Sequence, residues 1–448
     1  MRKPKSRAAA LLALAALLLM LPLSACGEKD EQVTVRYLNF KPEIADKYQE
    51  LADAYEKETG VKVIVDTAAN NTYEQTLMAK MSTADAPTLF QINGPRGYEN
   101  WQDYCADLSG TELYKHLTDK TLAVTDGNKV VGIPYVVEGY GIIYNKAITD
   151  NYFALTDRAT SYQSMDEINS FDKLRALVED MQKHAADLGI KGVFASTSLK
   201  AGEDWRWQTH LANIPITHEF TAKNVDLTSD ATKEIELRYS NEFKNIFDLY
   251  INNSVTDKKL LGTKTVSDSM AEFALEQCAM VQNGNWAWSQ IAGVTGNKVK
   301  AENIKYLPIY TGVAGEENQG LAIGTENFYA INANASEEEQ KAAADFIYWM
   351  YSSDKGKKTV TEELGFIAPF DTFAADDRPT DPLAQEIIRW MEKDGIRTIP
   401  WNFTVFPSSQ FKESLGSSLL KYAQGNKSWA SVTADMIADW KKESAAAS

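Results

Sequence analysis

The chain has 448 residues and an acidic composition, with 46 Lys and Arg against 62 Asp and Glu and a formal net charge of −16 at pH 7. An acidic surface of this size argues against nucleic acid or anionic lipid as a binding partner. Hydrophobic residues make up 44% of the chain, which is enough for substantial cores, and a chain of this length normally divides into two domains. Three cysteines are too few for a disulfide scaffold.

The N-terminus predicts an exported lipoprotein. Four basic residues lie among the first seven positions, an apolar run covers residues 8–21, and residues 23–26 read Leu-Ser-Ala-Cys. This arrangement resembles a bacterial lipobox, and the apolar run is too short for an ordinary membrane-spanning helix. We expect a signal peptide over residues 1–25, diacylation of Cys26, a tether over residues 26–32 and attachment to the outer face of the cytoplasmic membrane, in a Gram-positive type of cell. An uncleaved anchor or a chance cysteine is the alternative.

The first segment after the tether alternates between the two-residue periodicity of strands and the spacing of helices. Apolar residues recur every second position in 33–37 and 61–65, and a short apolar run covers 89–92. Between them, apolar residues recur at helical spacing in 44–59 and 73–81. This order predicts a βαβαβ unit and the opening of a parallel sheet.

Similar patterns continue along the chain. Residues 168–181 have helical periodicity and residues 189–194 read as the strand that follows, which indicates a second α/β unit. Ser336 and Glu339 have the spacing of a capping box before another helix. The C-terminal region predicts two more helices, 411–422 and 432–440, and we assign Trp440 to the core.

A search for catalytic motifs finds little. The sequence has no GxSxG elbow, no phosphate-binding GxxxxGK[ST] loop and no GxGxxG turn. The four histidines lack the spacing of zinc ligands, so no metal and no cofactor are predicted. Many carboxylates are present, so a pair that imitates a glycosidase dyad carries no information by itself.

Aromatic residues in polar surroundings are the most distinctive feature of the sequence beyond residue 200. Trp205, Trp286 and Trp401 each lie beside acidic, basic or amide side chains. An indole ring can pack against the apolar face of a pyranose while such neighbours hydrogen-bond to its hydroxyls. Core packing is the alternative for any one of these rings.

Several segments resemble family 1 extracellular solute-binding proteins. The main one is residues 273–291, FALEQCAMVQNGNWAWSQI, and the second is residues 133–146, IPYVVEGYGIIYNK. Shorter segments at 60–63, 86–90 and 320–332 agree in the right order. The resemblance extends from about residue 33 to 442.

The resemblance implies a two-lobed α/β fold of the periplasmic-binding-protein type II, with a ligand cleft between lobes joined by a hinge. It implies a first lobe made of residues 33–138 and 325–365. The second lobe is expected to comprise residues 139–324 and 366–448.

The resemblance also implies which residues contact the ligand. By position, Arg96 matches the family's cleft arginine, Glu138 its acidic hinge residue and Trp286 its stacking tryptophan. Further ligand contacts are implied at Asn39, Lys41, Asn93, Asp204, Trp205 and Trp401. The family commonly has proline where this chain has Asn285, so a different turn before Trp286 is expected.

We therefore expect a non-catalytic, monomeric protein that captures an oligosaccharide and delivers it to the permease subunits of an ABC importer. The absence of catalytic motifs agrees with this interpretation. A surface-anchored glycan hydrolase is the main alternative, because it could use the same aromatic residues with two carboxylates. A polyamine or peptide ligand, or a structural lipoprotein without a small ligand, also stays open.

Overall fold

The computed structural model describes residues 33–68, 72–227, 229–374 and 376–446. The predicted signal peptide, the tether and Cys26 lie outside these described residues. Within them, no helix combines the length and the apolar character that a membrane span requires. Cys105 and Cys278 are free thiols and do not bond to each other.

The first sheet begins with the predicted βαβαβ unit. Strand β1 (Thr34–Asn39) pairs in parallel with β2 (Lys62–Thr67) and β3 (Leu89–Ile92). Helices α2 (Ala45–Thr59) and α3 (Tyr73–Met81) make the connections, which confirms the prediction. The strand order is β2-β1-β3-β11-β5-β4, completed by the antiparallel strands β11 (Phe328–Ile331), β5 (Lys129–Pro134) and β4 (Val124–Asp126).

The second sheet has the order β12-β10-β6-β8-β7, with β9 paired to β6. Its central strand β6 is antiparallel to β8, so that Tyr140 lies opposite Gly284. The strands are β6 (Glu138–Asn145), β7 (Gly192–Phe194), β8 (Cys278–Gly284), β9 (Ile304–Leu307), β10 (Gln319–Gly324) and β12 (Arg397–Ile399). The predicted strand 189–194 is shorter at its start, because Gly189 has a positive φ of 68° and makes a turn.

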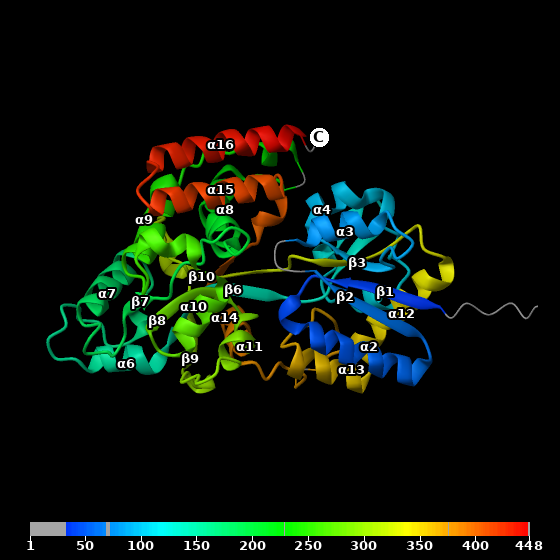
Figure 1. Cartoon of the computed structure of the whole chain (residues 1–448), viewed down its shortest axis with the longest axis horizontal. Helices are drawn as coiled ribbons and strands as arrows, with labels where there is room; N and C mark the ends of the chain where they lie inside the picture. Colours follow the sequence, from blue (N-terminus) through cyan, green and yellow to red (C-terminus); the bar gives the residue numbers. More distant parts are fainter. Residues whose placement is uncertain (1–32, 69–71, 228, 375, 447–448) are drawn as a thin grey trace, which may run out of the picture. The chain divides into compact units, whose positions relative to one another are not determined.

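Helices cover both faces of each sheet (Figure 1). On the first sheet, α2, α12 (Glu337–Ser352) and α13 (Asp354–Lys358) lie on one side, and α3 and α4 (Gly94–Trp101) lie on the other. On the second sheet, one hydrophobic cluster joins the sheet to the helices α6 (Lys146–Ala154), α7 (Phe171–Lys183), α8 (Ala212–Lys223), α9 (Ser240–Asn252), α15 (Ser409–Ala423) and α16 (Trp429–Ala446). A second cluster involves α10 (Val266–Ala274), α11 (Ala287–Ala292) and α14 (Pro382–Met391). The short helix α5 (Glu112–Lys115) contacts α12.

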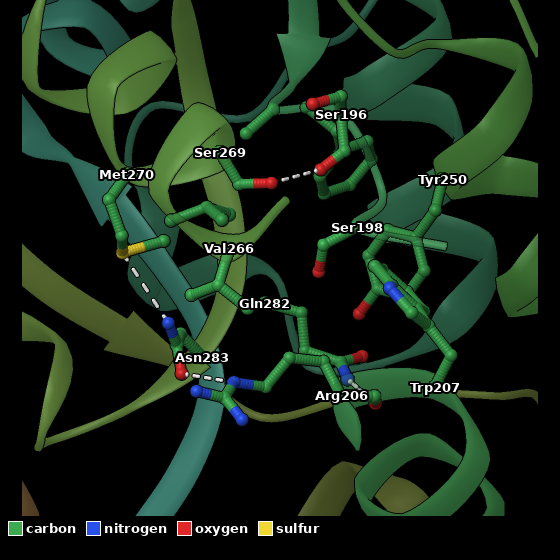
Figure 2. A pocket seen from close by; sticks show the side chains of 13 residues that line it. Ser196, Ser198, Arg206, Trp207, Tyr250, Val266, Ser269, Met270, Gln282 and Asn283 are labelled. Atoms are coloured by element: carbon green, nitrogen blue, oxygen red, sulfur yellow. Dashed lines mark hydrogen bonds between the residues drawn. The ribbon is translucent and has the colours of Figure 1, made fainter. Parts of the chain in front are cut away.

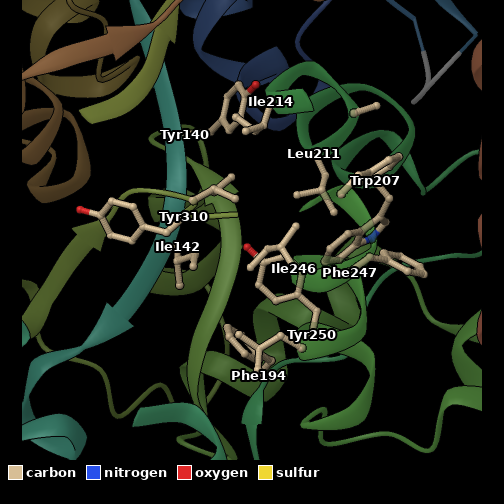
Figure 3. Close-up of a cluster of buried hydrophobic side chains, with 14 of the residues drawn as sticks. Tyr140, Ile142, Phe194, Trp207, Leu211, Ile214, Ile246, Phe247, Tyr250 and Tyr310 are labelled. Carbon is tan, nitrogen blue, oxygen red and sulfur yellow. The ribbon is translucent and has the colours of Figure 1, made fainter. Parts of the chain in front are cut away.

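The larger cluster of the second sheet is rich in aromatic rings (Figure 3). Tyr140 and Ile142 from β6 contribute to it together with Trp207, Phe247 and Tyr250. Trp440 is fully buried and donates its indole N–H to the carbonyl oxygen of Thr232 at 2.9 Å, which confirms its assignment to the core.

The chain passes from one sheet to the other at adjacent segments. Tyr135–Val137 connects β5 to β6, and Thr325–Asn327 connects β10 to β11. The amide of Val137 donates to the carbonyl oxygen of Ile367 at 2.8 Å, so a third segment runs alongside the first. The boundaries that the sequence suggests for the lobes stay a prediction.

Helix α12 begins with the predicted capping box. The amide of Glu339 donates to Ser336 Oγ at 3.2 Å, and the amide of Ser336 donates to Glu339 Oε2 at 3.0 Å. Both bonds satisfy N–H groups that the first helical turn cannot pair internally.

We predict that Ser336→Ala lowers the free energy of unfolding by about 1 kcal/mol, because the N-cap acceptor is lost. Urea denaturation of the purified protein measures this. Ser352→Ala is a matched control on the same helix, since the Ser352 hydroxyl donates only to the Tyr348 carbonyl within the helix. Equal losses in the two variants would contradict the capping role.

Candidate functional site

Two adjoining cavities lie between elements of the two sheets. The larger has a volume of about 550 Å³, and we call it the main cleft. It is lined by Phe40, Tyr73, Asn93 and Arg96 from elements of the first sheet, and by Asp204, Trp205, Phe403 and Lys412 from elements of the second. A smaller space of about 110 Å³, the side chamber, is lined by Lys41, Glu43, Glu138, Arg206, Trp286 and Glu326 among others. Phe40, Tyr73, Gly202 and Trp205 line both spaces.

A buried ion pair forms one wall of the side chamber. Lys41 Nζ lies 2.7 Å from Glu138 Oε1, and both side chains are at most 7% exposed. Lys41 follows β1, whereas Glu138 begins β6, so the pair joins segments that belong to different sheets. Burial opposes the charge of Lys41, but the carboxylates of Glu138, Glu43 and Glu326 together outweigh it and raise the pKa of Lys41.

Asn39 holds the loop that carries Lys41. The Asn39 Oδ1 accepts from the Lys41 amide at 2.9 Å, and its Nδ2 donates to the Lys41 carbonyl oxygen at 2.8 Å. The same Nδ2 also donates to Thr67 Oγ1 on the neighbouring strand at 3.2 Å. Asn39 is fully buried and lines neither cavity, so its place is behind the ligand space.

Trp286 follows β8 in a turn that depends on small and polar neighbours. A Cβ on Gly284 would lie 2.2 Å from the indole ring, so only glycine fits there. Asn285 Oδ1 accepts from the Gly139 amide at 2.9 Å, a bond that a carbonyl-bearing side chain provides and proline could not. The Trp286 ring is contacted by two cations, Lys41 Nζ at 5.7 Å and the Arg206 guanidinium at 5.4 Å from its centroid.

A π-helical turn, Arg206–Leu211, presents side chains to the side chamber. Such turns are often found at functional sites. Arg206 Nε donates to Asn283 Oδ1 at 2.7 Å, and Gln282 Nε2 donates to the Arg206 carbonyl oxygen at 2.7 Å (Figure 2). Strand β8 therefore fixes the guanidinium that faces Trp286. His210 of the same turn stacks on Tyr140, and burial lowers its pKa well below the usual value.

Asp204 and Trp205 enter the main cleft just before this turn. Asp204 is buried, and burial raises its pKa to about 6, while Gln208 Nε2 donates to its Oδ1 at 2.8 Å. A Cβ on Gly416 would lie 1.9 Å from Asp204 Oδ2, so glycine at this point of α15 allows the carboxylate to pack. Lys412, one turn earlier on α15, places Nζ 4.7 Å from the centroid of the Trp205 ring.

Asn93 and Arg96 lie at the start of α4 on the opposite wall of the main cleft. Arg96 Nη1 lies 2.5 Å from Glu99 Oε2 in an ion pair on the same helix. Asn93 Nδ2 donates to Glu326 Oε1 at 3.4 Å.

The structure thus brings together seven of the nine residues for which the sequence implies ligand contacts: Lys41, Asn93, Arg96, Glu138, Asp204, Trp205 and Trp286. Trp401 lines neither cavity. It is 5% exposed and packs among Tyr140, His210 and Phe403, beside Gly324, where a Cβ would collide with its ring. Ligand contact stays a prediction for all nine residues.

Other residues of the cavities carried little or no signal in the sequence. Glu326 and Lys412 are single charged residues in a chain with many charges, and no motif marks them, whereas Arg206 is marked only by its place beside Trp205. Neither Glu326 nor Lys412 lies in a segment that resembles the solute-binding family closely enough to assign a role. Among the described residues, no group of His, Cys, Asp and Glu side chains could hold a metal ion.

Comparison with solved structures yields sugar-binding proteins at low identity. A chitin oligosaccharide binding protein superposes with a TM-score of 0.67 at 18% identity, covering 93% of this chain and 100% of that chain. The protein RafE in complex with raffinose has a TM-score of 0.66 at 19% identity, with 92% and 100% covered. A sugar transporter from Bacillus licheniformis in complex with stachyose has a TM-score of 0.64 at 17% identity, with 92% and 100% covered.

These similarities confirm the predicted two-lobed α/β fold of the periplasmic-binding-protein type. No curated protein matches the sequence significantly. A family model for bacterial extracellular solute-binding proteins, however, matches residues 50–386, which is most of the chain. The chain therefore belongs to the family of bacterial extracellular solute-binding proteins.

Proposed function

We propose that this solute-binding protein captures an oligosaccharide in the main cleft and side chamber, and delivers it to the permease subunits of an ABC importer. The observation that carries the proposal is the position of Trp205, whose ring lines both cavities. A sugar chain extending from one space into the other would pass this indole. Structural neighbours described as complexes with raffinose and stachyose support the same ligand class.

The lining of the cavities suits a neutral, amphipathic ligand. Phe40, Tyr73 and Trp286 offer apolar ring surface against which the C–H face of a pyranose can pack. Amide groups and one ammonium group in the main cleft can hydrogen-bond to hydroxyls: Gln75, Asn93, Asn100, Gln208, Asn327 and Lys412.

A polyamine fits this lining less well. Lys41, Arg206 and Lys412 place positive charges inside the two cavities beside carboxylates such as Glu43 and Glu138, so the lining has mixed charge and is not the uniformly acidic surface that a polycation prefers. The carboxylate of Glu138 is already paired with Lys41 and is not free to bind a ligand cation.

The anchored location completes the proposal. We infer that Cys26 carries the lipid and that the mature protein is a monomer held at the outer face of the cytoplasmic membrane. Anchoring keeps the local concentration of a binding protein high near its permease. No catalytic step is proposed, because capture and release need no bond cleavage.

We predict that one or more neutral oligosaccharides raise the melting temperature of the purified protein. At a hundredfold excess over Kd, binding adds about 2.7 kcal/mol to the free energy of unfolding. The panel is maltotriose, raffinose, stachyose, xylotriose and chitotriose, with spermidine and a tripeptide as the alternative classes. A shift only with spermidine or the tripeptide refutes the carbohydrate assignment. Conversion of a stabilising sugar to products with turnover would instead favour a hydrolase.

Trp205→Ala should weaken binding of the stabilising sugar at least tenfold, or about 1.4 kcal/mol, because the largest of the rings that line both cavities is lost. Trp286→Ala should do the same from the side chamber. Isothermal titration calorimetry measures both. Trp288→Ala is the matched control, since Trp288 lies two residues further on in α11, is partly exposed and lines neither the main cleft nor the side chamber. An unchanged Kd in Trp205→Ala removes that ring from the site.

Cys26→Ser should release the protein into the medium, because the thiol that receives the lipid is lost. Immunoblots of medium and membrane fractions measure the distribution. Cys105→Ser controls for thiol loss elsewhere, since Cys105 is a free cysteine of the folded region. Retention of Cys26→Ser in the membrane fraction would contradict the lipid anchor.

A further inference from the structure

Glu326 occupies the boundary between the two cavities. It belongs to the segment Thr325–Asn327, which connects β10 to β11. Glu326 lines the side chamber, and the next residue, Asn327, lines the main cleft. A ligand that fills both spaces must therefore pass this connection.

The Glu326 carboxylate is buried with almost nothing to satisfy it. It is 7% exposed, and its one hydrogen bond is the long contact of 3.4 Å from Asn93 Nδ2. Within the described ranges, it makes no ion pair. A buried carboxylate is costly unless it is paired and hydrogen-bonded.

Other buried glutamates of the chain have strong partners. Glu138 pairs with Lys41, Glu272 with Lys264, and Glu386 with Arg389. Glu316 accepts bonds from the backbone amides of Phe171, Thr311 and Gly312. Glu326 has no comparable partner in the described part of the chain, and unlike Glu272, Glu316 and Glu386 it lines one of the two cavities.

The surroundings of Glu326 contain both signs of charge. Lys41 after β1, Arg206 from the π-helical turn and Lys412 on α15 attract its negative charge, whereas Glu138 on β6 repels it. The phenol groups of Tyr135 and Tyr140 also lie in its field. Burial is the largest influence and raises the pKa of Glu326 to about 7.

These charges indicate which ligand group the carboxylate takes. A ligand ammonium near Glu326 would also meet the positive charges of Lys41, Arg206 and Lys412, which offset the attraction of Glu326 and Glu138. A second carboxylate would meet Glu326 and Glu138. Neutral hydroxyls can donate to Glu326 and accept from Arg206 or Lys412, and they match both kinds of protein group.

We infer that Glu326 binds the ligand directly, accepting hydrogen bonds from sugar hydroxyls at the boundary between the main cleft and the side chamber, and that capture therefore depends on pH. This inference rests on the proposed function. The ionised carboxylate is the form that accepts these bonds. Affinity should thus be highest above pH 8 and fall as pH drops through 7, since protonation turns one oxygen into a donor.

The sign for the unliganded protein is opposite. A carboxyl whose pKa is raised on folding destabilises the folded state, and the loss develops as pH rises from the unfolded value near 4.5 to about 7. Glu326→Gln removes this loss with little change of shape. The variant should therefore melt at a higher temperature than the wild type at pH 8.5 and at the same temperature at pH 4.5, which also reports that it folds.

The test measures Kd by calorimetry for the wild type and Glu326→Gln at pH 5.5, 7.0 and 8.5. The probe is whichever of maltotriose, raffinose, stachyose, xylotriose or chitotriose stabilises the wild type most. The ratio of the two Kd values cancels titration of Asp204 and Glu138, which both proteins share. We expect the Kd of Glu326→Gln to exceed that of the wild type by about tenfold to a hundredfold at pH 8.5, because charge-assisted hydrogen bonds are lost. At pH 5.5, where the wild-type carboxyl is protonated, the two Kd values should agree to within about threefold.

Glu386→Gln is the matched control, a buried glutamate on α14 that lines neither cavity, and its ratio should stay near one at every pH. A Glu326→Gln ratio near one at pH 8.5, or one that does not change with pH, overturns the inference while the proposed function stands. If no sugar of the panel binds the wild type at any pH, the proposed function fails and the inference falls with it.

Discussion

The ion pair between Lys41 and Glu138 is the constraint on which the site depends. It connects the loop after β1 to the start of β6, and so it ties an element of each sheet to a common point. A buried pair gains little net stability from its own attraction, because both charges lose water, but removing one partner leaves an uncompensated charge that costs about 3–5 kcal/mol. Its role is therefore to specify geometry, since Glu138 Oε1 at 2.7 Å is a much nearer partner for the Lys41 ammonium than Glu43 Oε1 at 3.9 Å.

Side-chain hydrogen bonds to the backbone, together with two glycines, position the rest of the site around this pair. The Asn39 side chain fixes the backbone of Lys41, and Asn285 fixes the first residue after Glu138. Glycines at 284 and 416 then let Trp286 and Asp204 pack where any side chain would collide. Rings and charged groups consequently lie side by side in the cavities, as where Lys41 and Arg206 face the Trp286 ring. Such an arrangement favours ligands that are apolar on one face and hydroxylated at the edge.

Local patterns predicted the elements well, because helix and strand periodicity depend on neighbouring residues. The βαβαβ opening, the Ser336 cap and the buried Trp440 follow from short segments. The cavity positions of Glu138 and Trp286 could be anticipated because each lies in a segment with a recognisable order of residue types. The cavity positions of Glu326 and Lys412 could not, because their burial arises only when segments distant in sequence pack together. Asn39 lies behind the cavities and holds the loop that carries Lys41, and its contact with a ligand stays a prediction.

The formal net charge of −16 acts differently on charged and neutral solutes. A strongly acidic surface would accelerate encounter with a polycation and slow encounter with an anion, and both effects would weaken in salt. The proposed neutral oligosaccharide would experience neither effect, so its selection would have to come from contacts inside the cavities. Such a requirement would account for the buried charges in the cavities. Desolvated groups such as Glu326 are costly in the empty site, and a ligand whose hydroxyls satisfy them gains a preference over one that leaves them unpaired.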